Sequence, residues 1–276
     1  MNYISTRNNS KKASFEQVFL KGLSEDGGLF IPEKLKKFDQ NELEKLSILD
    51  YKSLAFNIIK LFTGNFISEK DLKNLIDKSY SNFREPEVIK IKKFSKNFLL
   101  ELYHGPTLAF KDIAMQLIGN FYEYYLQKNI KKINIIVATS GDTGAAAINA
   151  IKGKKNINIF VLHPNNRISS VQRKLMTTTE EKNVFNIAID GNFDDCQNLV
   201  KSMFSDTSFA NSINMSGVNS INWARIVAQT VYYFYSYFKI GKKNISFSVP
   251  TGNFGDVYAG YVAKQMGLPV NKFIVA

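Results

Sequence analysis

Hydrophobic residues recur three and four positions apart through much of the first 85 residues. Residues with this spacing share one face of a helix. The pattern predicts helices at residues 41–46, 51–62 and 68–79. Proline at position 86 disfavours helical backbone at the residue before it, so we place a boundary there. We predict a small, mostly helical N-terminal domain at residues 1–85.

From residue 86 to residue 276 the pattern changes to short β-branched or apolar runs that alternate with amphipathic helices. Strands are predicted at residues 97–103, 132–138, 157–162, 183–189, 245–249 and 272–276. Helices are predicted at residues 112–128, 144–151, 193–204, 221–239 and 256–266. Strands separated by helices of this length pair in parallel through crossovers, so residues 86–276 are predicted to form an α/β domain. The chain stops within the last predicted strand, and we expect the domain to be incomplete there.

Composition narrows the class of protein. The net charge is +12, but only five of the 36 cationic residues are arginine. Arginine binds phosphates and nucleic-acid bases in a more specific geometry than lysine does. The lysines are dispersed, so we interpret them as solvated surface charge and expect no nucleic-acid partner. A basic nucleic-acid-binding module stays as the alternative from a different class. The single cysteine, Cys196, excludes an internal disulfide and a cysteine-based zinc site, and no metal is predicted. No apolar run approaches the ~20 residues that span a bilayer, so we expect no membrane partner and a cytoplasmic location.

One strand-to-helix loop, at residues 249–256, combines glycines with free backbone amides. Gly252 and Gly255 permit positive φ or a close approach of backbone to ligand. The amides of this loop, at the positive end of a helix dipole, could hold a phosphate. The loop matches neither the P-loop nor the dinucleotide fingerprint. An ordinary tight turn is the alternative interpretation.

A second such loop follows the strand predicted at residues 132–138. Thr139, Ser140 and Thr143 add hydroxyl donors to the free amides of a helix start, which suits a carboxylate or phosphate. Asp142 could equally be a simple helix cap.

A third loop ends at Lys111, where predicted loop becomes predicted helix. Leu108, Ala109 and Phe110 precede this lysine, and apolar neighbours disfavour its charged form. Lys111 is therefore a candidate amine nucleophile, with a surface lysine as the alternative. Arg167, Arg173 and Lys174 could meet a substrate phosphate or form a basic surface.

Four motifs together carry a resemblance to a known family. They are Leu-Tyr-His-Gly-Pro-Thr-Leu-Ala-Phe-Lys-Asp at 102–112, Thr-Ser-Gly-Asp-Thr-Gly at 139–144, Asn-Ser-Ile-Asn-Trp-Ala-Arg at 219–225 and Pro-Thr-Gly-Asn-Phe-Gly-Asp at 250–256. In order and approximate spacing the chain resembles the threonine synthase family, in its longer bacterial and fungal branch. Four motifs in order are far more specific than any one of them.

The resemblance implies a pyridoxal-phosphate enzyme with the three-layer, parallel-sheet fold of the tryptophan-synthase-β type (fold type II). It implies conversion of O-phospho-L-homoserine and water to L-threonine and phosphate, the last step of threonine biosynthesis, by a monomer. Lys111 matches the family's Schiff-base lysine and would act as the catalytic base. The residues that match the cofactor-phosphate loop are Gly252, Asn253, Phe254, Gly255 and Asp256. Those that match the substrate-carboxylate loop are Thr139, Ser140, Gly141, Asp142 and Thr143. Arg167, Arg173 and Lys174 are candidates for the substrate phosphate.

Two alternatives stay open within this resemblance. One is another lyase of the same cofactor group, such as a threonine or serine dehydratase. Those relatives usually carry asparagine where Asp142 stands, so Asp142 favours threonine synthase. The other is an inactive fragment, because family members continue beyond position 276. The segment that follows there would carry the residue that meets the pyridine nitrogen.

Overall fold

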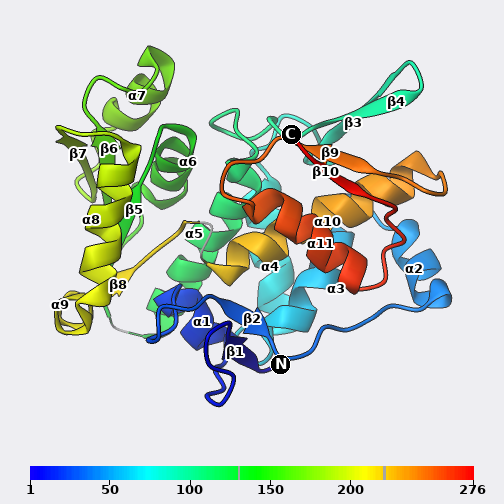
Figure 1. Ribbon diagram of the computed structural model, residues 1–276, viewed down its shortest axis with the longest axis horizontal. Coiled ribbons are helices and arrows are strands. Elements are labelled where there is room, and N and C mark those ends of the chain that lie inside the picture. Colours follow the sequence, from blue (N-terminus) through cyan, green and yellow to red (C-terminus); the bar gives the residue numbers. More distant parts are fainter. Residues whose placement is uncertain (130, 220–221) are drawn as a thin grey trace.

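A four-stranded parallel sheet, in the order β7-β6-β5-β8, forms the centre of one side of the molecule (Figure 1). The computed structural model describes residues 1–129, 131–219 and 222–276. The strands of this sheet are β5 (Ile133–Ala138), β6 (Ile157–Pro164), β7 (Val184–Ile189) and β8 (Met215–Ser216). The helices around it are α6 (Asp142–Ile151), α7 (Ser170–Thr177), α8 (Phe193–Ser205) and α9 (Thr207–Ser212).

Alternating residues of β5 face the two helical layers that cover this sheet. Ile135 and Val137 belong to the main core together with the alanines of α6. Ile136 and Ala138 join a second apolar cluster that contains Cys196 of α8. Burial on both faces explains why β-branched residues occupy neighbouring positions of this strand, Ile135 to Val137. The predicted α/β class with a parallel sheet is confirmed.

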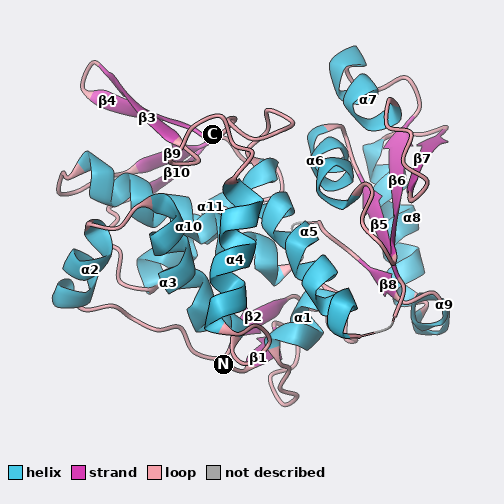
Figure 2. Ribbon diagram, turned by 180° about the vertical axis from the view of Figure 1, so that it is seen from behind, coloured by secondary structure: helices cyan, strands magenta, loops and turns pink. Residues whose placement is uncertain are grey.

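Helices make up most of the other side of the molecule (Figure 2). In chain order they are α1 (Phe15–Lys21), α2 (Gln40–Ser47), α3 (Tyr51–Thr63), α4 (Glu69–Tyr80), α5 (Lys111–Lys128), α10 (Trp223–Ile240) and α11 (Gly255–Gln265). Polar side chains that accept a first-turn amide start the first four, namely Ser14, Asp39, Asp50 and Ser68. The mostly helical character predicted for the N-terminal region is confirmed.

The long helix α10 lies at the centre of this side, because α3, α5 and α11 all pack against it. Its aromatic residues at positions 223 and 232–235 are buried, and those at 237 and 238 are half-buried. The predicted start at residue 221 lies outside the described residues. One core includes residues from before and after Pro86, and the domain boundary placed there stays a prediction.

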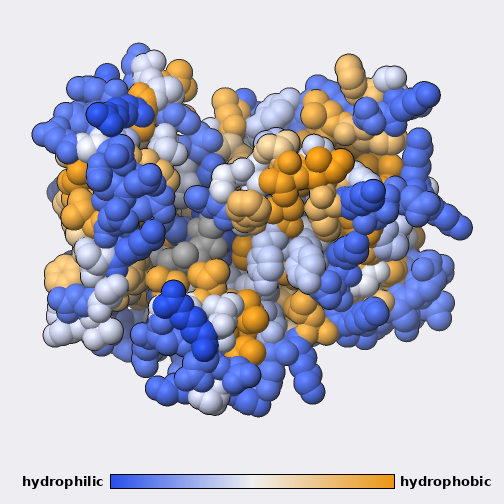
Figure 3. All heavy atoms as spheres, viewed as in Figure 1, coloured by the Kyte–Doolittle hydropathy of each residue, from blue (hydrophilic) through white to orange (hydrophobic). Residues whose placement is uncertain are grey.

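Six further strands form three small sheets. β1 (Tyr3–Ser5) pairs with β2 (Phe30–Pro32), and β3 (Lys90–Phe94) with β4 (Asn97–Glu101), both antiparallel. β9 (Phe247–Val249) pairs in parallel with β10 (Phe273–Val275). The strands predicted at 245–249 and 272–276 therefore pair with each other, apart from the four-stranded sheet. The face shown in Figure 3 is largely hydrophilic, with an apolar group over the end of β10, where Ile274 and Val275 are exposed.

No helix within the described part of the chain is both long and apolar enough to cross a membrane. The same residues contain no group of three histidine, cysteine or acidic side chains arranged to hold a metal ion.

Because α5 packs closely on α6, a larger side chain at Gly119 is expected to destabilise the fold. A Cβ atom at this position would lie 2.5 Å from the carbonyl oxygen of Ala150. We expect Gly119→Ala to lower the free energy of unfolding by about 1–3 kcal/mol, in spite of alanine's helix preference, because backbone must move. Urea denaturation measures this. Gln127→Ala on the exposed side of the same helix should change stability by less than about 0.5 kcal/mol, and equal effects would contradict the packing argument.

Candidate functional site

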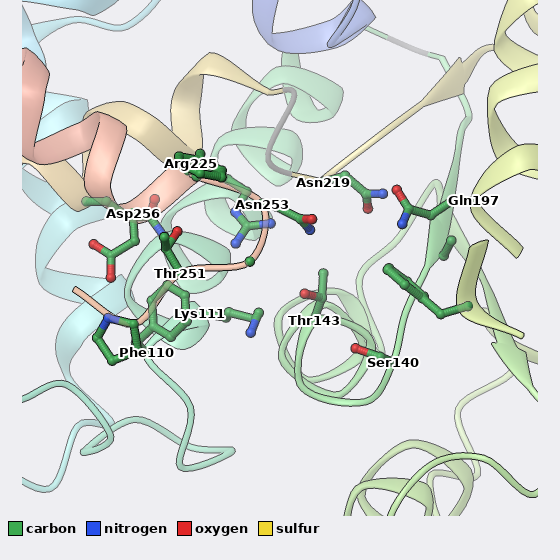
Figure 4. Close-up of a pocket in the computed structure, with 17 residues that line it drawn as sticks. Phe110, Lys111, Ser140, Thr143, Gln197, Asn219, Arg225, Thr251, Asn253 and Asp256 are labelled. Atoms are coloured by element: carbon green, nitrogen blue, oxygen red, sulfur yellow. The ribbon is translucent and has the colours of Figure 1, made fainter. Parts of the chain in front are cut away.

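A cavity of about 320 Å³ lies between the four-stranded sheet and the helical side of the molecule (Figure 4). Its volume is in the range of small-molecule sites. Residues from five separate segments line it: Phe110, Lys111, Ala138, Ser140, Thr143, Phe193, Gln197, Asn219, Arg225, Gln229, Pro250, Thr251, Gly252, Asn253, Phe254, Gly255 and Asp256. The structure thus brings together the three loops that the sequence singled out.

Lys111 is the first residue of α5, and its amine is largely removed from solvent. The side chain is 21% exposed, and Nζ lies 3.7 Å from Oδ2 of Asp142. Nζ also lies over the ring of Phe110, 4.6 Å from its centre. Burial lowers the pKa of Lys111 below its ordinary value; the carboxylate of Asp142 opposes this effect and the charge of Arg225 adds to it. A lysine with a lowered pKa offers more neutral, nucleophilic amine.

The loop before Lys111 is fixed to the start of α5 by the next residue, Asp112. This buried carboxylate accepts hydrogen bonds from the backbone amide and the hydroxyl of Thr107, each 2.7 Å long. Gly105 lies so close that a Cβ atom there would be 2.4 Å from the Cβ of Asp112. Glycine, threonine and aspartate at these spacings therefore set the position of Lys111.

The start of α11 offers free backbone amides to the cavity. Phe254 precedes the helix with a φ of +57°, and within the described residues no side chain caps the first turn. Nothing lies within 4 Å of a Cβ atom built on Gly252, so the backbone there faces open space. An uncapped helix start carries partial positive charge and favours an anion.

The loop after β5 is shaped by Thr139. Its hydroxyl oxygen accepts hydrogen bonds from the amides of Gly141, at 2.9 Å, and Gly144, at 2.8 Å. Asp142 accepts a hydrogen bond of 2.6 Å from Gln172 and faces Lys111. Ser140 and Thr143 line the cavity, whereas Thr139, Gly141 and Asp142 are not among its lining residues.

Arg225 is the main cavity residue that the sequence reasoning did not assign. It is 3% exposed, and its Nε has no hydrogen-bond partner among the described residues. One guanidinium nitrogen donates a long bond, 3.4 Å, to the carbonyl of Val218. Burial lowers the pKa of Arg225 to about 10. The sequence did contain a signal for Arg225, because one of the four motifs that carry the family resemblance, at residues 219–225, ends at this arginine.

Arg167, Arg173 and Lys174 do not lie at the cavity. All three are exposed, in the turn after β6 and on α7. The sequence places them directly after a parallel strand, where site residues are common, and α7 packs against α6. Their assignment to a substrate phosphate stays a prediction.

The cavity suits a ligand that carries an anion and reacts with an amine. It holds the half-buried amine of Lys111, the buried guanidinium of Arg225 and the open amides of α11. The unpartnered Nε of Arg225 is the orphaned buried donor that such an anion would satisfy. Because nothing lies within 4 Å of a Cβ position at Gly252, a phosphate has room to approach the backbone there.

Comparison with known proteins gives consistent relatives. The family model described as pyridoxal-phosphate-dependent enzyme matches residues 86–276, and the one described as threonine synthase N terminus matches residues 2–80. The threonine synthases of Pseudomonas aeruginosa and Saccharomyces cerevisiae are each 47% identical to this chain, over 100% and 99% of its length. The solved structure of a threonine synthase from Brucella melitensis with bound pyridoxal phosphate is 46% identical and matches the whole chain with a TM-score of 0.92.

The chain spans about three fifths of the length of these relatives. It covers 60% of the Pseudomonas protein, 57% of the yeast protein and 60% of the Brucella chain.

The burial of Lys111 predicts its titration. Competitive labelling with acetic anhydride over a pH series should give a pKa below the ordinary 10.5, and Asp142→Asn should lower it further by removing the opposing charge. The unfolded chain serves as the reference. Because the folded chain binds this proton less tightly, its contribution to stability should increase as pH rises from the folded pKa toward 10.5. An ordinary or raised pKa would contradict the burial of the amine.

Proposed function

Since the chain belongs to the family of pyridoxal-phosphate-dependent enzymes, we propose that it carries the threonine synthase reaction, in which O-phospho-L-homoserine and water yield L-threonine and phosphate. The observation that carries the proposal is that the Lys111 amine and the open start of α11 line one cavity, although 141 positions separate Lys111 and Gly252. The relatives named threonine synthase support the choice of reaction. The PLP-bound Brucella structure supports the cofactor.

Pyridoxal phosphate, when bound, supplies an aldehyde that an amine can attack and a ring that withdraws electrons from the Cα of an amino acid. Lys111 has the amine for that attack, and burial favours the neutral form of this amine by lowering its pKa. Nζ of Lys111 would also be placed to accept a proton from the Cα of a substrate held in the cavity. Asp142, 3.7 Å from Nζ, would stabilise the protonated amine that results.

The anionic groups have separate places in this proposal. The backbone amides of Gly252, Asn253, Phe254 and Gly255, with the first turn of α11, hold the cofactor phosphate. Ser140 and Thr143 hold the substrate carboxylate at the start of α6. Arg225 adds a buried positive charge that offsets the charge of a phosphate group in the same cavity.

From the sequence we also propose that the enzyme is a monomer and that it acts in the cytoplasm on a small-molecule substrate.

The role of Lys111 is tested by covalent attachment. Borohydride reduction of the chain with pyridoxal phosphate should fix the cofactor on the peptide that contains Lys111, as mass spectrometry reads directly. Lys111→Ala should abolish the attachment while far-UV circular dichroism stays unchanged. Lys174→Ala, on exposed α7, is the matched control and should label as the parent does. A label on any other lysine refutes the assignment.

The reaction itself is tested by its products. The chain loaded with pyridoxal phosphate should release inorganic phosphate from O-phospho-L-homoserine and form threonine, and it should release little ammonia from threonine. Ammonia release without phosphate release would indicate a dehydratase instead. Neither product, from a chain that holds the cofactor on Lys111, would show an inactive fragment.

A further inference from the structure

Two adjacent tyrosines of α10 hold the side chain of Asp256, the second residue of α11. Tyr233 donates a hydrogen bond of 2.8 Å to Oδ1 of Asp256, and Tyr232 donates to the same oxygen. The hydroxyl of Tyr233 also reaches the backbone carbonyl of Asp256, at 3.1 Å. Both tyrosines are almost fully buried, with ring centres 5.0 Å apart. The carboxylate is thus drawn toward α10 by two donors on one oxygen.

This arrangement is unusual for an acidic residue in the first turn of a helix. A carboxylate there ordinarily turns to the free backbone amides, because it neutralises the positive end of the dipole. Within the described residues Asp256 makes no such bond, and α11 has no side-chain cap. The amides next to the cavity stay open although a potential acceptor is one residue away.

Charged groups on two other elements also face Asp256. Arg225 of α10 and Lys111 of α5 both attract its carboxylate. Burial raises the pKa of Asp256, and the hydrogen bonds from the two tyrosines and the two cations oppose that rise. Lys111, Arg225 and Asp256 itself all line the cavity, so the orientation of this carboxylate changes the charge that the cavity presents to an anion.

We infer that Tyr232 and Tyr233 are positioning residues that keep the Asp256 carboxylate away from the first-turn amides of α11, so that a phosphate can bind there. Without the two hydroxyls, Asp256 turns to those amides and competes with the incoming anion. The inference rests on the proposed function for the identity of that anion, while the competition itself is a property of this chain. Asp256 therefore belongs to the cofactor site through its backbone, with its side chain held aside.

The test measures anion binding by isothermal titration calorimetry, with inorganic sulfate and with pyridoxal phosphate added to the full chain. The Tyr232→Phe/Tyr233→Phe variant should bind both about tenfold more weakly, the scale of a lost hydrogen bond to a charged group. Adding Asp256→Ala to that variant should restore sulfate affinity to within about twofold of the parent, since it removes the competitor and leaves no buried hydroxyl unpaired.

Two controls separate positioning from packing. Tyr235→Phe removes a buried hydroxyl from the same helix, one that bonds to Glu87 at 2.8 Å, and should leave both affinities unchanged. Lys243→Ala removes an exposed lysine that does not line the cavity and should also leave both affinities unchanged. A chain that never attaches the cofactor but shows the sulfate pattern would refute the proposed function and support this inference.

Two results would overturn the inference. In one, the double tyrosine variant binds sulfate as tightly as the parent. In the other, the triple variant stays as weak as the double variant, which would mean that lost packing rather than the carboxylate weakens binding. If the double variant does not fold, each single tyrosine variant should show part of the loss and its reversal by Asp256→Ala, and no loss in either would refute the inference.

Discussion

Hydrogen-bond donors without acceptors, gathered at one cavity, are the constraint on which this structure depends. The first turn of α11 begins without a side-chain cap among the described residues, and the Nε of Arg225, which lines the same cavity, has no partner there. Lys111 lies in the same cavity, with Asp142 as its nearest carboxylate. Buried donors and cations without partners cost free energy, so a fold retains them where a ligand supplies the missing acceptor. A ligand with a phosphate would supply acceptors for the free amides and for Arg225, and an amine-reactive group on the same ligand would engage Lys111.

The rest of the fold places those groups. The main core spans both sides of the molecule and fixes α5, α10 and α11 against one another. Asp112 and Gly105 set the loop that precedes Lys111, and Thr139 sets the loop opposite. The chemistry is thus carried by three loop-to-helix junctions, and in two of them a buried side chain a few residues away holds the backbone in place.

The sequence predicted the features that depend on local pattern. The β-branched run of β5 and the helical spacing of α3 and α4 could be interpreted from neighbours alone, and so could the special character of Lys111 and Gly252. Pairing at long range could not: β9 and β10 pair with each other apart from the four-stranded sheet, and the residues of neither strand specify that partner. Arg225 was missed for a related reason, because it lies on a helix whose pattern indicates a buried core element and it reaches the cavity only through tertiary packing.

In the proposed enzyme one ligand joins Lys111 to the start of α11. A crystal structure of the chain grown with pyridoxal phosphate would show this directly. We expect continuous electron density from Nζ of Lys111 through a pyridine ring, ending in a phosphate within hydrogen-bond distance of the amides at residues 252–255. Density for the cofactor elsewhere, or a phosphate turned away from α11 while the ring stays near Lys111, would contradict it.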